Sequence, residues 1–142
     1  MSEIIVSAHQ PNFIPYLGFF DKMKKSDIFV IRDEVLFTDS DYHHRNRIRI
    51  NGNDNMNNPQ FKWLTLPVKK TNDAIRHIHL KKDVKIKNKT WRECLLHDIK
   101  ASYETAPFFS EFFPKIREIF ENEYENLVSL NMRIINLLKD LF

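Results

Sequence analysis

Two short apolar runs, with a helical pattern between them, open the chain. Ile4–Val6 is rich in β-branched residues and too short for a helix, so it predicts a buried strand, and Ile28–Ile31 predicts another strand. A loop made stiff by two prolines follows the first run, and apolar residues three and four apart predict a helix over Tyr16–Lys25. Strand, helix and strand at this length form a βαβ unit, which implies a parallel sheet.

The middle of the chain alternates with a period of two. Arg45–Ile50 predicts a strand with three arginines on one face and Asn46, Ile48 and Ile50 on the other. Asn51-Gly52 is a hairpin-turn signal, and a polar loop over Asn53–Pro59 precedes a second strand over Gln60–Val68. The two strands are predicted to pair antiparallel.

Two less regular segments follow the hairpin. Ala74–Leu80 is compatible with a short strand, on which His77 and His79 would share a face. Lys81–Lys89 contains five lysines and is read most simply as a solvated surface.

Helical spacing dominates from Thr90 to the end of the chain. Thr90 and Glu93 form a T-x-x-E capping box that begins the first helix. A second helix is predicted over Phe108–Glu121, where Pro114 either starts the helix or kinks it, and its phenylalanines are read as core. Glu123–Phe142 carries a stripe of leucine and isoleucine and forms the third helix.

These elements predict a single α/β domain over residues 1–142. It consists of an N-terminal βαβ unit with a mostly parallel sheet, an antiparallel hairpin and three C-terminal helices. The last helix ends on the apolar pair Leu141-Phe142, which indicates that the natural protein continues or that a partner or second copy packs there.

Composition narrows the classes of function. The net charge of +3 and the pI of about 9.0 suit an anionic substrate and are low for a nucleic-acid-binding protein. Two glycines, with no GxGxxG or GxxxxGK[ST], exclude the usual nucleotide fingerprints. Cys94 is the only cysteine, and neither a signal peptide nor an apolar run long enough to cross a membrane is seen. We therefore expect a soluble cytoplasmic protein.

The ends of the two parallel strands are the first candidate site, because ligands bind beyond the carboxyl ends of such strands. His9, Gln10 and Asn12 follow the first strand, and Asp33 with Glu34 follows the second. His9 is a candidate acid–base or phosphate contact, or a histidine bonded within its own loop. Asp33 is a candidate base or Mg²⁺ ligand, or part of an acidic turn.

The arginine strand is the second candidate. Arg45 and Arg47 would lie about 7 Å apart on one face and could grip a pyrophosphate, with Asn46 beside them to orient the substrate. The alternative is a solvated face of an edge strand, where charge prevents aggregation.

No metal site is predicted. His43-His44 with Asp39 and Asp41 matches no zinc spacing, and adjacent histidines on a strand point apart. Cys94 is read as a small buried residue, and the sequence identifies no cofactor.

Four blocks in one order carry a resemblance. HQPNFIPYLGFFDKMKKSDIFVIRDEVLF, RNRIRI, KWLTLPVKK and the stretch from a tryptophan to YETAPFF resemble the WbqC-like family, over Ile4 to about Leu141. That family is associated with bacterial O-antigen gene clusters, and its members are usually longer. The resemblance implies a part in making or decorating a surface polysaccharide or another activated metabolite, and the chain looks like the N-terminal part of a member.

A second resemblance concerns the opening alone. Strand, loop, helix and strand are similar to the start of nucleotidylyltransferase folds, which carry HxGH at the head of the first helix. The corresponding stretch here, residues 15–19, has no histidine. The likeness therefore implies fold more than chemistry.

Two functions follow as hypotheses. The first is a transferase acting on a nucleotide-activated sugar or a similar anionic substrate, with His9 as acid–base, Asp33 as a second catalytic group, and Gln10, Asn12, Arg45, Asn46 and Arg47 binding substrate. The second is a non-catalytic binding or assembly subunit of a polysaccharide-synthesis complex, which docks through its last helix.

Overall fold

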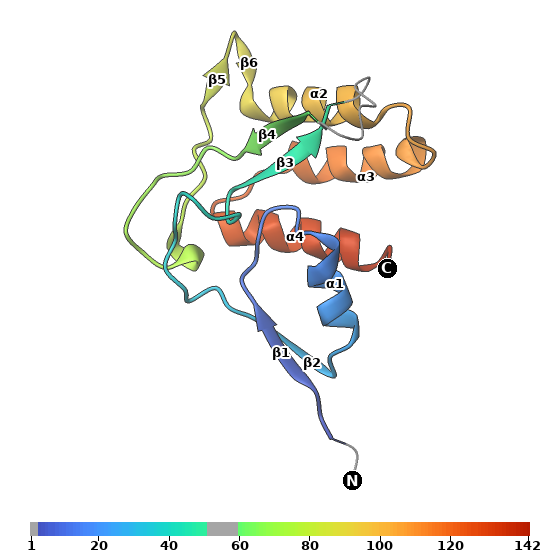
Figure 1. Ribbon diagram of the computed structural model, residues 1–142. Helices are drawn as coiled ribbons and strands as arrows, with labels where there is room; N and C mark the ends of the chain where they lie inside the picture. The colour runs from blue at the N-terminus through green and yellow to red at the C-terminus, as the bar shows by residue number, and fades with distance from the viewer. Residues whose placement is uncertain (1–2, 51–59) are drawn as a thin grey trace.

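The helices and strands follow one another in an α/β order (Figure 1). The structure is a computed structural model and describes residues 3–50 and 60–142, so the predicted Asn51-Gly52 turn and Asn53–Pro59 loop lie outside the described residues. The described elements are β1 (Val6–His9), α1 (Leu17–Lys24), β2 (Ile28–Ile31), β3 (Arg45–Arg49), β4 (Phe61–Thr65), η1 (Ile75–His77), β5 (Lys85–Ile86), β6 (Lys89–Thr90), α2 (Trp91–Tyr103), α3 (Phe109–Glu121) and α4 (Leu127–Lys139).

The predicted βαβ unit is confirmed. β1 and β2 pair in parallel with His9 opposite Ile31, and α1 connects them. Parallel pairing in the described residues is confined to these two strands, and each hairpin forms a separate two-stranded sheet.

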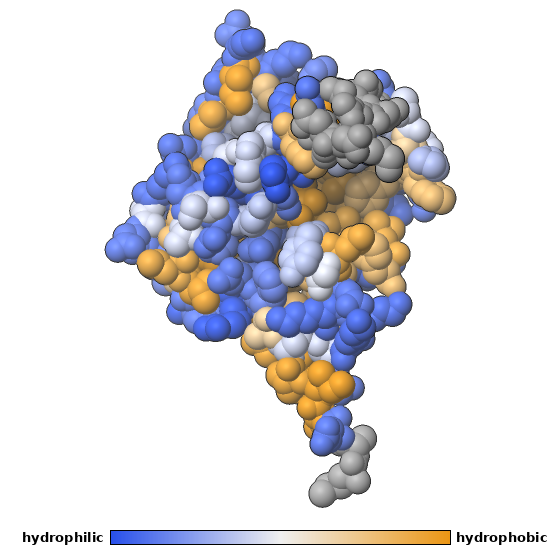
Figure 2. Space-filling view, in the orientation of Figure 1, coloured by the Kyte–Doolittle hydropathy of each residue, from blue (hydrophilic) through white to orange (hydrophobic). Residues whose placement is uncertain are grey.

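The expectation that the first apolar run is buried was wrong. Ile4, Ile5 and Val6 are exposed, and β1 begins only at Val6. β1 and β2 lie at one end of the molecule, where α1 packs beside them (Figures 1 and 2). This position at the end of the molecule leaves the start of β1 exposed. α1 buries Phe19 and Phe20 with Ile135 of α4, and Phe29 and Ile31 pack against this cluster.

The predicted antiparallel hairpin is also confirmed. Arg47 of β3 lies opposite Trp63 of β4, and Ile48 and Leu64 are buried on the inner side. The arginines therefore share the outer face of this hairpin with Trp63 and Phe61.

Residues 74–80 do not form the expected strand. Ile75–His77 is a 3₁₀ turn, flanked by single bridges that join Ala74 to Leu36 and Leu80 to Val68. The Asp73 carboxylate accepts hydrogen bonds from the Ala74 N–H and from the His77 ring, and such local bonds compete with a strand ladder.

A two-residue turn organises the lysine-rich segment. Lys87 and Asn88 have φ values of 49° and 66° and join β5 to β6, as a hairpin turn with two left-handed residues requires. The five lysines are exposed, as predicted.

Each C-terminal helix has an identifiable start. The predicted capping box is confirmed, since the Thr90 N–H donates to Glu93 Oε2 at 2.7 Å and the Glu93 N–H to Thr90 Oγ1 at 3.2 Å. α3 continues through Pro114, whose missing N–H removes one helical hydrogen bond. α4 begins after Asn126, whose side chain accepts the Ser129 N–H, and so starts later than the pattern indicated.

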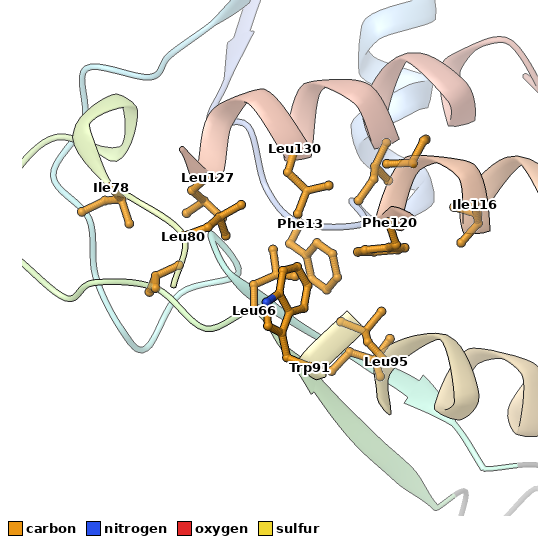
Figure 3. Close-up of a cluster of buried hydrophobic side chains, with 14 of the residues drawn as sticks. Phe13, Leu66, Ile78, Leu80, Trp91, Leu95, Ile116, Phe120, Leu127 and Leu130 are labelled. Carbon is orange, nitrogen blue, oxygen red and sulfur yellow. The ribbon is translucent and has the colours of Figure 1, made fainter. Parts of the chain in front are cut away.

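The main core lies between the hairpin and the C-terminal helices (Figure 3). Phe13, from the loop after β1, is fully buried there beside Leu66 of the segment after β4 and Leu130 of α4. The predicted stripe of α4 supplies Leu127, Leu130 and Ile134 to this core.

The end of the chain packs partly on α1. The Phe142 ring lies 5.3 Å from the Phe20 ring, yet Phe142 and Leu141 remain about half exposed. No helix among the described residues has the length and apolar character needed to cross a bilayer.

The polar side chain of Asn131, on α4, is fully buried. Its Nδ2 donates to the carbonyl oxygens of Pro11 at 2.7 Å and His43 at 2.8 Å. It therefore ties the loop after β1 and the segment before β3 to the same helix.

We expect Asn131→Ala to lower the free energy of unfolding by about 2 kcal/mol or more, because two buried carbonyls lose their donor. Urea denaturation measures this change. Asn136→Ala, at an exposed position of the same helix, is the control and should change stability by less than about 0.5 kcal/mol. Equal effects of the two substitutions would contradict the role given to Asn131.

Candidate functional site

The loop after β1 is held by backbone and side-chain hydrogen bonds from three directions. Asn131 binds the Pro11 carbonyl from α4, and the Phe13 N–H donates to the Tyr42 carbonyl at 2.9 Å. From β3, Asn46 Nδ2 donates to the carbonyls of Phe13 at 3.2 Å and Ile14 at 2.6 Å. The loop therefore has a defined place between α4 and the hairpin.

Ile14 has an unusual backbone conformation within this loop. Its φ is 46°, which a β-branched residue rarely adopts, and Pro15 follows it. The Asn46 amide binds the carbonyls on both sides of this strained peptide, and its Oδ1 accepts the Arg47 N–H at 2.7 Å. Asn46 thus keeps a high-energy loop conformation in place beside the site.

A cavity of about 360 Å³ lies where this loop meets the hairpin. Its lining comes from the loop and the start of α1, from the segment before β3, and from both hairpin strands. The lining residues are Asn12, Pro15, Tyr16, Tyr42, Asn46, Arg47 and Phe61, and we call this cavity the Arg47 cavity.

Arg47 is the charged group of this lining. Its guanidinium carbon lies 5.2 Å from the centre of the Phe61 ring and 5.6 Å from that of Trp63. Among residues 3–50 and 60–142, no carboxylate is paired with it. Within the described residues, the guanidinium thus contacts aromatic rings and no carboxylate occupies its hydrogen-bonding fork.

Asn12 supplies an unsatisfied polar atom. Its Oδ1 is buried and has no hydrogen-bond partner in the described structure. An unpaired buried acceptor costs about 1–3 kcal/mol, which a donor on a ligand would recover.

Arg45 belongs to the wall behind the cavity. Its Nη2 donates to the Ser40 carbonyl at 2.9 Å, and its guanidinium lies 4.5 Å from the centre of the Trp63 ring. Trp63 in turn lies 6.1 Å from Tyr42, with 30° between the ring planes. Arg45 therefore contacts Trp63, and Trp63 lies next to Tyr42; we call these three residues the Tyr42 column, of which Tyr42 lines the cavity.

Gln10 points into the protein. Its Oε1 lies 3.2 Å from Nε2 of His43, which is fully buried, and the Thr38 N–H donates to the other ring nitrogen at 3.4 Å. Burial lowers the pKa of His43 below its usual range, so the ring is neutral and bonded on both sides. Gln10 helps to hold the loop.

His44 is buried beside the surface carboxylate of Asp39. Its Nε2 lies 3.3 Å from Asp39 Oδ1, and Lys70 binds the other oxygen of that carboxylate at 2.7 Å. Burial lowers the pKa of His44, and the Asp39 charge opposes this effect. In the described parts of the chain, no group of three or more His, Cys, Asp or Glu side chains is placed to hold a metal ion.

His9 packs against aromatic rings. Its Nδ1 is 3.0 Å from the Gln10 carbonyl, and its ring centre is 5.0 Å from that of Phe19 and 6.5 Å from that of Tyr16. Tyr16 is among the residues that line the cavity, and His9 is not.

Asp33 faces the 3₁₀ turn. Its Oδ1 is 4.0 Å from Arg76 Nη1, and its carbonyl accepts the Arg76 N–H at 3.0 Å. Neighbouring Glu34 pairs with Arg32 at 2.7 Å, and this hydrogen bond lowers the pKa of Glu34. Neither carboxylate is among the residues that line the cavity.

The predicted site residues are thus divided. Asn12, Asn46 and Arg47 meet at one cavity, whereas Gln10 and Arg45 support its walls. The sequence interpretation missed the aromatic lining, Tyr16, Tyr42 and Phe61. Gly18 follows Tyr16 by two residues, and a Cβ on this glycine would overlap the Tyr16 ring, so the glycine makes room for this tyrosine.

Another cavity, of about 350 Å³, lies between α2, α3 and the inner face of β3. Ile14, Ile48, Phe108, Phe112 and Ile116 are among its apolar lining residues. The predicted packing role holds for the buried Phe120, whereas Phe108 is exposed at the rim. Cys94 is half-buried on α2 and not fully buried as expected.

Comparisons with known proteins give one family. The model of the WbqC-like protein family matches residues 10–142. The chain belongs to the WbqC-like family. Rv1507c, an uncharacterized protein of Mycobacterium tuberculosis, is a relative with 28% identity over 132 residues, which cover 92% of this chain and 53% of the relative. The chain spans about half the length of that relative, and no solved structure matches the chain.

In this family member, we expect Asn46→Asp to destabilise the fold by about 2 kcal/mol, because a carboxylate oxygen replaces the donor to two carbonyls. Asn72→Asp, which adds the same charge at an exposed position, is the control. Thermal and urea unfolding of both variants tests the prediction, and equal stabilities would refute it.

Stability should also fall as the pH is lowered from neutral. The folded pKa values of His43 and His44 are below the unfolded value of about 6.5, so the unfolded chain takes up protons first. The stabilisation present above pH ~6.5 is lost as the pH falls toward the folded values, at up to about 1.4 kcal/mol per pH unit for each histidine.

Urea titrations at several pH values between about 7.5 and 5.5 measure this slope. His43→Gln should flatten it, and His97→Gln, at an exposed position, should leave it unchanged. A wild-type stability independent of pH over this range would show that the prediction is wrong.

Proposed function

We propose that the Arg47 cavity binds the phosphate-bearing part of a small metabolite, as the substrate site of a transferase in bacterial surface-polysaccharide synthesis. The observation that carries the proposal is the Arg47 guanidinium, which lines a cavity and has no carboxylate partner in the described structure. A planar guanidinium in this state suits the bidentate geometry of phosphate and pyrophosphate oxygens.

The cavity lining suits a ligand that carries both an anionic group and a hydrogen-bond donor. Arg47 offers donors to an anionic group, and Asn12 offers an unsatisfied acceptor to a hydroxyl or N–H group. A phosphorylated sugar or a nucleotide carries both kinds of group. The mildly basic net charge of +3 favours the approach of such anions.

The catalytic part of the proposal rests on His9. Its ring contacts Tyr16, whose side chain is exposed. A movement of the Tyr16 side chain would therefore connect His9 to the cavity. His9 would then act as acid–base at the transferred group. Asp33 is proposed as a second catalytic group from its place after β2, although its nearest charged partner is Arg76.

The polysaccharide context comes from the family. WbqC-like proteins are associated with O-antigen gene clusters, and activated sugars there carry phosphate. The cytoplasm, where such metabolites are made, is the proposed location.

The second candidate function is a binding subunit without catalysis. The observation in its favour is that neither His9 nor Asp33 is among the residues that line the cavity. The two functions separate on turnover, because the transferase requires that His9→Gln abolish transfer while ligand binding remains. A binding subunit would retain its complex and its ligand in the same variant.

We expect pyrophosphate to raise the thermal midpoint of the wild-type chain and to bind Arg47→Ala about 10- to 150-fold more weakly, since a charged hydrogen bond contributes about 1.5–3 kcal/mol. Arg47→Lys should recover only part of the affinity, because lysine lacks the planar fork. Isothermal titration calorimetry measures the dissociation constants of pyrophosphate for the wild type and the two variants.

Arg133→Ala is the matched control, since it removes the same charge from an exposed position of α4. Equal weakening by the two alanine variants would mean that only the net charge matters. Absence of binding to the wild-type chain would reject the proposed site.

A further inference from the structure

The Arg47 cavity has an aromatic wall as well as a charged group. Three of its lining side chains are aromatic, and Tyr16, Tyr42 and Phe61 are 64%, 41% and 50% exposed. Exposed aromatic rings around one cavity provide faces for a planar ring of a ligand.

Tyr42 differs from the other two rings because it is supported from behind. Trp63 lies next to it, and the Arg45 guanidinium covers Trp63 at 4.5 Å. The Ser40 carbonyl fixes Arg45, and the Tyr42 carbonyl is tied to the Phe13 N–H. These contacts restrict Tyr42 before a ligand binds, which lowers the entropy that binding would cost there.

Resting on the proposed function, we infer that Tyr42 is the stacking residue for a nucleobase, so that the substrate of the Arg47 cavity is a nucleotide. The base extends the Tyr42 column by one ring. Its phosphates then bind Arg47, which lines the same cavity and lies 5.6 Å from Trp63 of that column.

The polar lining agrees with this placement. The unpartnered Oδ1 of Asn12 is an acceptor, and the donors that a nucleotide brings to it are ribose hydroxyls and base N–H groups. No GxGxxG or GxxxxGK[ST] loop is needed, because the anion is bound by a guanidinium and not by the N-terminus of a helix. Stacking alone discriminates weakly between bases, so both purine and pyrimidine nucleotides should bind.

The test compares uridine diphosphate, adenosine diphosphate, glucose 1-phosphate and pyrophosphate by calorimetry on the wild-type chain, Tyr42→Ala and Tyr42→Phe. We expect both nucleotides to bind the wild type about 5- to 150-fold more tightly than pyrophosphate, from base–aromatic stacking of about 1–3 kcal/mol. Tyr42→Ala should lose this advantage and keep its affinity for pyrophosphate, while Tyr42→Phe keeps both.

Tryptophan fluorescence adds a readout of position. The chain has two tryptophans, and Trp63 is 45% exposed whereas Trp91 is buried. Nucleotide binding should change the emission of Trp63 and the change should vanish in Trp63→Phe. Phe108→Ala, which removes an exposed ring outside this cavity, is the control and should keep the change in Trp63 emission.

The outcomes separate the two proposals. If pyrophosphate and the nucleotides bind the wild type equally, the stacking role of Tyr42 is wrong while the anion site stands. If glucose 1-phosphate gains the same advantage through Tyr42, the column binds a sugar ring and the nucleotide assignment is overturned. If none of the four binds, both proposals fail together.

Discussion

The arrangement of the site depends on one buried amide. Asn131 lies on α4, among apolar residues, and donates to two segments that are 32 positions apart in the chain, at Pro11 and His43. Leaving those carbonyls unpaired in the core would cost more than the hydrogen bonds themselves contribute. The loop after β1 and the segment before β3 are therefore fixed relative to the same helix, and the Arg47 cavity lies where they meet the hairpin.

A second amide adjusts the loop on the opposite side. Asn46 uses its donor on the carbonyls that flank the strained Ile14 peptide and its acceptor on the Arg47 N–H. The same side chain thus sets the shape of the loop and the position of the cationic residue. Its role is to position the cavity wall, and the groups that we propose to bind the ligand are Arg47 and Asn12, next to the Tyr42 column.

Binding is consequently better supported by the geometry than catalysis. The cavity joins a cation, an unsatisfied acceptor and aromatic faces, which are the groups that the proposed phosphate-bearing metabolite requires. His9 has the right chemistry, but it contacts the lining residue Tyr16 and does not itself line the cavity.

The sequence by itself determined the elements whose causes are local. The βαβ order, the alternation of β3 and β4 and the Thr90 capping box were predicted correctly, because each depends on residues within a few positions. Residues 74–80 were mispredicted, since the side chain of Asp73 favours a turn there.

Only the tertiary structure decided which residues share the Arg47 cavity. Tyr42 and Phe61 reach it through the pairing of distant segments, and the exposure of β1 depends on what packs beside it, which no local pattern encodes.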